Sequence, residues 1–430
     1  MSSVRICVVG LGYVGLPTAL KFAQAGHAVS GYDIRPSLIR SLSDGTYRSV
    51  EPGVSELYQG LLESGRISFT GSVTPADAFI LAVPTPLYAS QEPDLSAVKA
   101  ATLAVAPHVV EGTLVIVEST VPPGTTRRLE SLVNSGGTLF AHVPERVLPG
   151  NILEEIVLND RVIGGTTRRA AEVARDLYRT FVRGEIYITT AEVAETAKLM
   201  ENAYRDVNVA LANEFARISR AIGVSAREAI QLANRHPRVH ILNPGVGVGG
   251  HCVPVDPMFL VSSAPHLSTL LRTARSVNRS QPGYVVDLLE GLLNGLRGKR
   301  VAVLGMAYKP NVDDVRETPV HDLLAALLDR GAQVAVHDPL VARYREWESR
   351  PLETVLPDAD AILVATGHSQ FSTIPDTTIG MVSDRAVVFD TAACLDAARW
   401  ERMGHSVLIL GDGSTPVSAD QGYRPNVASS

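Results

Sequence analysis

The pattern of apolar and polar residues near the N-terminus predicts alternating strands and helices. Residues 4–35 read VRICVVGLGYVGLPTALKFAQAGHAVSGYDIR: an apolar run, a glycine-rich turn, an amphipathic stretch and a second apolar run. This is the order of a βαβ unit. Further short apolar runs, separated by stretches of helical character, follow at Ala78–Val83, Thr113–Val117 and Thr138–His142. The alternation predicts a mostly parallel sheet with helices on both faces.

The apolar period changes from about Thr189. Over about seven helical turns an apolar residue recurs every three or four positions, which predicts one long helix. The stripe consists of Val193, Ala197, Met200, Tyr204, Val207, Leu211 and Phe215. A helix of this length is suited to join two domains, and its apolar stripe is suited to bury a partner subunit. We therefore expect a homodimer or a higher homo-oligomer.

A second alternation of apolar runs starts near Lys299, in the segments KRVAVLG, AQVAVHD, AILVATG and AVVFDTA. The predicted fold class is therefore α/β, with two Rossmann-like doubly wound domains joined by a central domain built on the long helix. We place a first Rossmann domain at 1–188, the helical domain at 189–298 and a smaller Rossmann-like domain at 299–430. The Ser-, Gly- and Pro-rich tail from about Asp412 is predicted to be loop or disordered.

Composition narrows the classes of function. A chain of 430 residues with 45% hydrophobic and 20% charged residues is typical of a globular protein with two or three domains. The net charge of −6 and the lack of a dense Lys/Arg cluster argue against nucleic acid as a partner. No stretch approaches the ~18 apolar residues that a membrane helix needs, so no membrane partner is expected. Cys7, Cys252 and Cys394 are far apart and odd in number, which favours a reducing cytoplasm over a disulfide framework. No CxxC spacing occurs, and no metal site is expected.

The first glycine turn predicts a dinucleotide site. Gly10, Gly12 and Gly15 form GxGxxG between a strand and a helix, where a tight turn and the helix N-terminus accommodate a pyrophosphate. Tyr13 and Val14 lie in the same turn and belong to the predicted cofactor site. A merely structural glycine turn is the alternative.

Asp33 discriminates between two dinucleotides. It ends the second predicted strand, 18 residues after Gly15, at the position that binds the 2′-hydroxyl of a ribose. Its carboxylate repels a 2′-phosphate, so NAD is expected rather than NADP, although Arg35 nearby weakens this preference. Thr85 and Thr120 each follow a predicted strand, where an open α/β sheet places its ligands, and they are predicted to bind the cofactor. As isolated residues, both threonines are more typical of turns.

Two further segments carry candidate chemistry. The segment GVGVGGHCVPVDP places Cys252 in a glycine-rich loop, which by itself is more typical of a structural thiol than of a nucleophile. Glu195, Lys198, Asn202 and Arg205 lie at i, i+3, i+7 and i+10 and share one face of the predicted long helix. By itself this face is typical of a solvated stripe with an incidental charge pair.

Taken together, the motifs resemble those of the UDP-glucose/GDP-mannose dehydrogenase family. The matching segments occur in the family's order and read GLGYVGLPTAL, VPTP, ESTVPPGTT, PERVLPG, AETAKLMENAYRDVN, GVGVGGHCVPVDP and GMAYKPNVDDVRETP. The resemblance implies an NAD-binding domain, a central helical dimerisation domain and a UDP-binding domain. It also implies a four-electron oxidation, in which the C6 alcohol of a nucleotide sugar becomes a carboxylate at the expense of two NAD+.

The resemblance also implies roles for five catalytic residues. Cys252 would hold the half-oxidised sugar as a thiohemiacetal and then as a thioester. Lys198 would exchange a proton with the alcohol or stabilise a developing oxyanion, and Asn202 would donate a hydrogen bond to it. Asp256 would be the base, and Glu145 would support hydrolysis of the thioester. The alternatives are that Asp256 caps a turn and that Glu145 forms a surface salt bridge.

The likeness is greater to the branch of the family that oxidises UDP-N-acetylhexosamines than to the UDP-glucose branch. It is carried by PERVLPGN, LANRHPRV and GVGGHC, while Pro149, Val255 and His251 replace the Glu, Lys and Ser of the UDP-glucose branch. The expected substrate is UDP-N-acetyl-D-mannosamine. The alternatives are UDP-N-acetylglucosamine or UDP-glucose and, in another class, an inactive regulator that binds NAD and UDP-sugars.

The resemblance further implies a set of ligand contacts. The expected substrate-binding residues are Arg146, Val147, Lys198, Asn202, Arg205, His236, Arg238, Gly249, Tyr308 and Lys309. Arg238 is expected to act from the neighbouring subunit, and His236 and Arg238 are alternatively a surface pair. Arg316 is expected to reach the NAD, because a planar guanidinium fits a pyrophosphate. His368 and Gln370 receive no role, and UDP contacts near Asp390 are left open.

Overall fold

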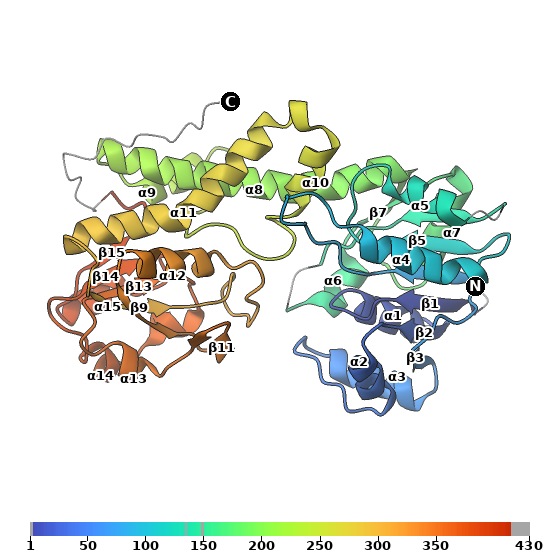
Figure 1. Cartoon of the computed structure of the whole chain (residues 1–430), viewed down its shortest axis with the longest axis horizontal. Helices are drawn as coiled ribbons and strands as arrows, with labels where there is room; N and C mark the ends of the chain where they lie inside the picture. Colours follow the sequence, from blue (N-terminus) through green and yellow to red (C-terminus); the bar gives the residue numbers. More distant parts are fainter. Residues whose placement is uncertain (1–2, 134–135, 148–149, 414–430) are drawn as a thin grey trace. The chain divides into compact units, whose positions relative to one another are not determined.

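The computed structural model describes residues 3–133, 136–147 and 150–413, so Pro149 and most of the Ser-, Gly- and Pro-rich tail lie outside the described residues. The chain forms two compact units. We call Met1–Ala203 with Val255–Thr269 the N-terminal unit, and Tyr204–Pro254 with Leu270–Ser430 the C-terminal unit. Helix α8 contributes residues to both units (Figure 1).

The N-terminal unit is built on a sheet of eight strands in the order β3-β2-β1-β4-β5-β6-β7-β8. Neighbouring strands are parallel except β6 and β7. Because β1 lies between β2 and β4, the strand order reverses there, and the carboxyl ends of β1 and β4 border the crevice where such sheets bind ligands. The strands are β1 (Arg5–Val9), β2 (Ala28–Tyr32), β3 (Ile67–Thr70), β4 (Ala78–Leu81), β5 (Leu114–Val117), β6 (Leu139–His142), β7 (Arg161–Gly165) and β8 (Ile186–Thr190).

Helices cover both faces of this sheet. Ile6 and Val8 of β1 belong to the core that α1 and α7 close, whereas Cys7 and Val9 belong to the core that α4 and α5 close. This alternation is the period-2 pattern of a strand buried on both sides. The helices are α1 (Gly15–Gln24), α2 (Pro36–Ser43), α3 (Val54–Glu63), α4 (Ser96–Val105), α5 (Thr125–Val133), α6 (Ile152–Leu158), α7 (Arg168–Tyr178) and α10 (Asp256–Ser263), with 3₁₀ turns at Ala106–His108 and Pro265–Leu267.

The C-terminal unit repeats this architecture with a five-stranded parallel sheet in the order β10-β9-β13-β14-β15. Helices α11 and α12 pack on one face, and α13, α14 and α15 on the other. The strands are β9 (Arg300–Leu304), β10 (Gln333–His337), β13 (Ala361–Val364), β14 (Val387–Asp390) and β15 (Val407–Ile409), with a hairpin of β11 (Arg343–Tyr344) and β12 (Trp347–Glu348). The helices are α9 (Ala226–Ala233), α11 (Thr269–Leu293), α12 (Pro319–Asp329), α13 (Leu352–Val355), α14 (Asp376–Ile379) and α15 (Ala397–Arg402), with a 3₁₀ turn at Ser369–Thr373. The predicted α/β class with two Rossmann-like sheets is confirmed.

The predicted long helix is α8 (Ala191–Ile222), which has 32 residues. Its burial is the reverse of that of an ordinary amphipathic helix. Met200 and Tyr204 of the predicted apolar stripe are 58% and 62% exposed, whereas polar residues of the opposite face are buried. These buried residues are Glu195, Asn202, Asp206, Asn208 and Asn213. The helix therefore directs polar groups into the chain and presents an apolar stripe to the outside.

Candidate active site

The glycine turn between β1 and α1 has the geometry of a dinucleotide site. Gly10 has a φ of +92°, and a Cβ there would lie 2.6 Å from the carbonyl oxygen of Ala82. A Cβ on Gly15 would lie 1.9 Å from the carbonyl oxygen of Gly10. A Cβ on Gly12 would meet no atom within 4 Å. The fold therefore requires the first and third glycines, whereas the open space at Gly12 fits the close approach of a phosphate.

Asp33 lies directly after β2, beside this turn. Its Oδ2 accepts a hydrogen bond from the backbone N–H of Leu11 at 3.0 Å, and the Arg35 side chain binds both carboxylate oxygens. Burial by itself favours the neutral acid, but Arg35 and the N–H of Leu11 hold the pKa of Asp33 below its usual value. A charged carboxylate at this position fits the ribose hydroxyls of NAD.

The other predicted cofactor residues surround the same turn. Tyr13 donates its hydroxyl hydrogen bond to Glu51 at 2.6 Å, and Val14 is the N-cap residue of α1. Thr85 donates to the carbonyl of Thr120 at 2.7 Å, so the structure brings the two predicted threonine loops together. The Thr85 hydroxyl thus ties one loop to the other.

A buried polar cluster joins α8 to the start of α10. The side-chain N–H of Asn202 donates to Asp256 Oδ2 at 2.6 Å, and Asp256 is 2% exposed. Burial raises the pKa of Asp256 to about 6, against the opposing effects of the Lys198 ammonium and the Asn202 amide. A carboxyl group with a pKa near neutrality beside a cation and an amide donor is an arrangement for proton transfer.

Glu195 fixes α8 against the loop that carries Thr120. Its carboxylate accepts from the backbone N–H of Gly124 and from both the N–H and the hydroxyl of Thr126, at the N-terminus of α5. The predicted polar face of the long helix is thus buried at its N-terminal end. The interpretation of this face as a solvated stripe is wrong there, because Glu195 and Asn202 are buried.

Glu145 lies in a second buried cluster. One of its carboxylate oxygens accepts from the N–H of Val147 at 2.7 Å, and the other lies 3.6 Å from the guanidinium of Arg161. Burial raises the pKa of Glu145. The alternative of a surface salt bridge is wrong, because both Glu145 and Arg161 are buried.

Sequence reasoning missed Glu118, His142 and Arg161, which are buried in this region. Glu118 is buried, accepts from Thr18 and Tyr178, and lies 4.0 Å from Arg161. Burial raises the pKa of Glu118 to about 7 and lowers that of His142 to about 3, which keeps the imidazole neutral. The available signal was their position, since Glu118 and His142 stand at the carboxyl ends of two neighbouring strands, β5 and β6.

The glycine loop with Cys252 belongs to the C-terminal unit, where it packs against the AYKP segment. A Cβ on Gly249 would lie 2.6 Å from Tyr308 Cβ, and Gly250 donates its N–H to the carbonyl of Arg316 at 3.0 Å. Burial raises the pKa of Tyr308, with smaller contributions that include Asp314 and Cys252. The close approach of Tyr308 leaves no room for a Cβ on Gly249 or Gly250.

The other residues that we predict to bind the substrate or the cofactor are exposed or half-buried. Arg146 forms an ion pair with Glu201, and Arg316 forms one with Asp314 at 2.6 Å. Arg205, His236 and Arg238 are exposed, and Lys309 is half-buried. His236 Nδ1 accepts from the backbone N–H of Arg238 at 3.3 Å, so these two residues form a local turn. Their roles in binding stay predictions.

A dinucleotide turn followed by an aspartate, together with a buried Asn202–Asp256 pair near Lys198, defines an NAD-dependent dehydrogenase of the Rossmann class. The chain belongs to the UDP-glucose/GDP-mannose dehydrogenase family. The family's NAD-binding domain matches residues 4–182, its central domain 192–280 and its UDP-binding domain 302–397. The protein is therefore an oxidoreductase that uses NAD and nucleotide sugars.

Known relatives extend over nearly the whole chain. A UDP-N-acetyl-D-mannosamine dehydrogenase of Methanococcus maripaludis is 42% identical over 419 residues, which are 95% of this chain and 97% of the relative. An NDP-N-acetyl-D-galactosaminuronic acid dehydrogenase of Ralstonia nicotianae is 40% identical over 413 residues, with 92% and 97% covered. The solved structure of a UDP-D-ManNAc dehydrogenase from Pyrococcus horikoshii has a TM-score of 0.89 at 40% identity and covers 95% of this chain and 99% of its own. Across the ranges that the structure describes, no helix combines the length and apolar character needed to span a membrane.

Proposed function

We propose that this protein is a UDP-N-acetyl-D-mannosamine 6-dehydrogenase that oxidises the C6 alcohol to a carboxylate through a covalent intermediate on Cys252. One observation carries the mechanism: Asp256 is buried, bonded to Asn202 and near Lys198, and it follows Cys252 by only four residues. The relatives named for UDP-N-acetyl-D-mannosamine support the choice of sugar.

The first oxidation converts the alcohol to an aldehyde. Asp256, directly or through a water molecule, takes the hydroxyl proton while a hydride leaves C6. The Lys198 ammonium and the Asn202 amide stabilise the negative charge that develops on the oxygen. Bound NAD+ supplies the hydride acceptor, and two molecules are used for each sugar because each takes two electrons.

The second oxidation keeps the aldehyde on the enzyme. The Cys252 thiolate adds to the aldehyde carbon, and the resulting oxyanion takes a proton to give a thiohemiacetal. Loss of that proton and of a second hydride leaves a thioester. Glu145 activates the water that attacks the thioester, which releases the carboxylate product and the Cys252 thiolate. The buried position of Glu145 and its raised pKa suit a group that takes up and returns a proton near neutral pH.

We further propose a homodimer formed through α8. Leu211, Ile218 and Ile222 continue the exposed apolar stripe along the helix and are 41%, 49% and 67% exposed. A stripe of this kind on an otherwise polar surface is typical of a subunit interface. The proposed compartment is the cytoplasm, which fits three cysteines that form no disulfide.

The choice of sugar is tested by NADH formation with four purified substrates: the UDP conjugates of N-acetylmannosamine, N-acetylglucosamine, N-acetylgalactosamine and glucose. We expect turnover on UDP-N-acetyl-D-mannosamine with two NADH per sugar. Turnover on UDP-glucose alone would contradict the proposed substrate. Binding of UDP without NADH formation on any of the four would favour the inactive regulator.

The covalent step is tested with Cys252→Ala. Loss of the nucleophile should lower the rate of uronic acid formation by about three orders of magnitude or more. The matched control is Cys394→Ala, because burial raises the pKa of the Cys394 thiol to about 12 and keeps it protonated. Native rates of uronic acid formation in the Cys252 variant, measured by mass spectrometry, would refute the mechanism.

A further inference from the structure

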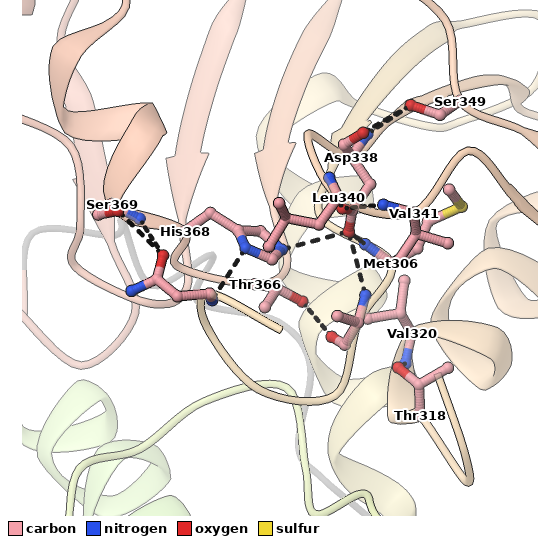
Figure 2. Close-up of polar contacts among 12 residues, drawn as sticks. Met306, Thr318, Val320, Asp338, Leu340, Val341, Ser349, Thr366, His368 and Ser369 are labelled. Carbon is pink, nitrogen blue, oxygen red and sulfur yellow. Dashed lines mark hydrogen bonds and ion pairs between the residues drawn. The ribbon is translucent and has the colours of Figure 1, made fainter. Parts of the chain in front are cut away.

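The C-terminal unit contains a buried histidine that the proposed reaction does not use. His368 follows β13, is 0% exposed, and faces Asp338 at the end of β10. Figure 2 shows the two side chains directed at each other from neighbouring loops at the carboxyl ends of their strands. The two side chains lie beside residues Met306–Asn311, which we call the AYKP loop. This loop carries Tyr308 and Lys309.

Asp338 holds the first end of the AYKP loop. Its Oδ2 accepts the backbone N–H groups of Met306 at 2.6 Å and Ala307 at 3.2 Å. Thr366 adds a third bond to the same end, because its hydroxyl donates to the carbonyl of Ala307 at 2.6 Å. The other carboxylate oxygen of Asp338 accepts from Leu340 and Val341, so the anchor itself is fixed (Figure 2).

His368 holds the second end of the loop. The backbone N–H of Asn311 donates to His368 Nδ1 at 3.0 Å, and the Asn311 side-chain oxygen accepts from the N–H and hydroxyl of Ser369. Because Nδ1 accepts, the proton of the neutral ring is on Nε2, which donates to Asp338 at 3.2 Å. The edge-to-face contact with Phe371 at 5.5 Å holds the plane of the ring.

The His368 ring connects the two ends of the AYKP loop, because it bonds both Asn311 and Asp338. Asn311 has a φ of +61°, in the left-handed region that asparagine adopts more readily than most residues. The residues between the two anchors are those proposed to face the UDP-sugar, and Tyr308 packs against Gly249 of the Cys252 loop. We propose that His368 is a positioning residue that, by accepting the Asn311 N–H on a ring that Asp338 orients, holds the AYKP loop in the conformation that binds the UDP-sugar. This inference rests on the proposed role of Tyr308 and Lys309.

Two substitutions at position 368 each remove one of the two hydrogen bonds of the His368 ring and keep the other. In His368→Asn the side-chain oxygen can replace Nδ1 as the acceptor for Asn311, whereas the bond to Asp338 is lost. In His368→Gln the side-chain amide can replace Nε2 as the donor to Asp338, whereas Asn311 loses its acceptor. We expect His368→Gln to raise the Kd for UDP and the KM for the UDP-sugar about tenfold, the scale of one lost hydrogen bond. His368→Asn should keep both within about threefold of the native values.

The measurements are isothermal titration of the full-length protein with UDP, and steady-state kinetics. The KM for NAD should change less than threefold in His368→Gln, because the dinucleotide turn lies in the N-terminal unit, which is untouched. His321→Gln is the matched control in the same unit and should leave the Kd for UDP unchanged. A native Kd for UDP in a folded His368→Gln variant would overturn the proposal, as would equal losses of affinity in both His368 variants.

Titration with UDP also separates this inference from the proposed function. If the native protein fails to oxidise UDP-N-acetyl-D-mannosamine but UDP affinity still depends on His368, only the proposed substrate is refuted, and the positioning role of His368 stands. If His368→Gln lowers the melting temperature while UDP affinity is native, His368 supports the domain alone and the positioning role is refuted.

Discussion

The two Rossmann-like sheets carry an aspartate at the same topological position and use it differently. Asp33 follows β2 and Asp338 follows β10, and each of these strands pairs with the first strand of its sheet. Each carboxylate accepts the N–H of the residue after the glycine that ends that first strand, Leu11 in one unit and Met306 in the other. The backbone of the two turns is therefore held in the same way.

The difference lies in the other bonds of the two carboxylates. The remaining side-chain partner of Asp33 is Arg35, whose own side chain is 57% exposed. Asp338 accepts from four backbone N–H groups and from His368, within a site where both side chains are 0% exposed. A carboxylate whose hydrogen-bond partner is exposed can exchange that partner for a ligand. A carboxylate surrounded by buried donors stabilises the fold instead. The same aspartate is thus suited to bind a cofactor in one unit and to anchor a loop in the other.

Asp256 extends the comparison to the proposed catalytic cluster. It is as buried as Asp338, yet among the described residues the side chain that donates a hydrogen bond to its carboxylate is Asn202. Burial is the largest influence on both acids, but the bonds from His368 and from backbone N–H groups lower the pKa of Asp338 to about 2, whereas the pKa of Asp256 is raised to about 6. The larger number of donors thus keeps Asp338 charged, whereas Asp256 becomes a proton acceptor near neutrality.

The largest expected effect is the loss of kcat when Asp256, rather than Asp338, is substituted. Asp256→Asn should lower kcat by about 10²–10⁴-fold, because the proton acceptor is lost while the shape is kept. The measurement is NADH formation at saturating substrates. Asp338→Asn, provided that it folds, should retain a kcat within about tenfold of native and so serves as the control. Equal losses of kcat in both variants would remove the distinction between the two acids.

The same pair of substitutions should have opposite effects on stability. The lowered pKa of Asp338 contributes stability above pH 4 that is lost as the pH falls toward 2, so Asp338→Asn should cost about 2 kcal/mol at pH 7. Because the pKa of Asp256 is raised to about 6, its ionisation destabilises the fold increasingly from pH 4 to pH 6 and fully above pH 6, so Asp256→Asn should gain about 3 kcal/mol at pH 7 and little at pH 4. Calorimetric melting at both pH values checks the signs.

The pH dependence of the reaction gives a further test of the Asp256 assignment. Because its pKa is about 6, kcat should fall tenfold for each unit of pH below 6, as the acceptor becomes protonated. The fall should be measured over a pH range in which the protein stays folded. A kcat that is constant from pH 7 to pH 5 would exclude Asp256 as the base.

The smallest effect concerns the exchangeable partner of Asp33. Asp33→Ser removes the acceptor for the ribose hydroxyls and releases the Arg35 guanidinium for a 2′-phosphate. We expect the KM for NAD to rise about tenfold and measurable activity with NADP to appear. The double variant Asp33→Ser/Arg35→Ala should lose the activity with NADP. Activity with NADP that survives in the double variant would show that Arg35 is not the phosphate ligand.

Much of the architecture was predictable because local patterns specify it. The apolar run at Ala78–Val83 became β4, and the stripe from Val193 became α8, since strand and helix periods arise from backbone geometry alone. The dinucleotide turn was predictable for the same reason, as Gly10 and Gly15 have no room for a Cβ. The importance of Cys252 emerged only when several motifs were considered together.

The remainder depended on contacts between distant segments. By itself the sequence determined two nucleotide-type sheets, a long helix between them, and the residue types needed for oxidation at C6. Only the tertiary structure decided that α8 buries its polar face, that Asn202 bonds Asp256 54 residues away, and that His368 bonds Asn311 57 residues away. Burial and the number of donors set the pKa of each buried carboxyl group, and both depend on which segments the fold brings together.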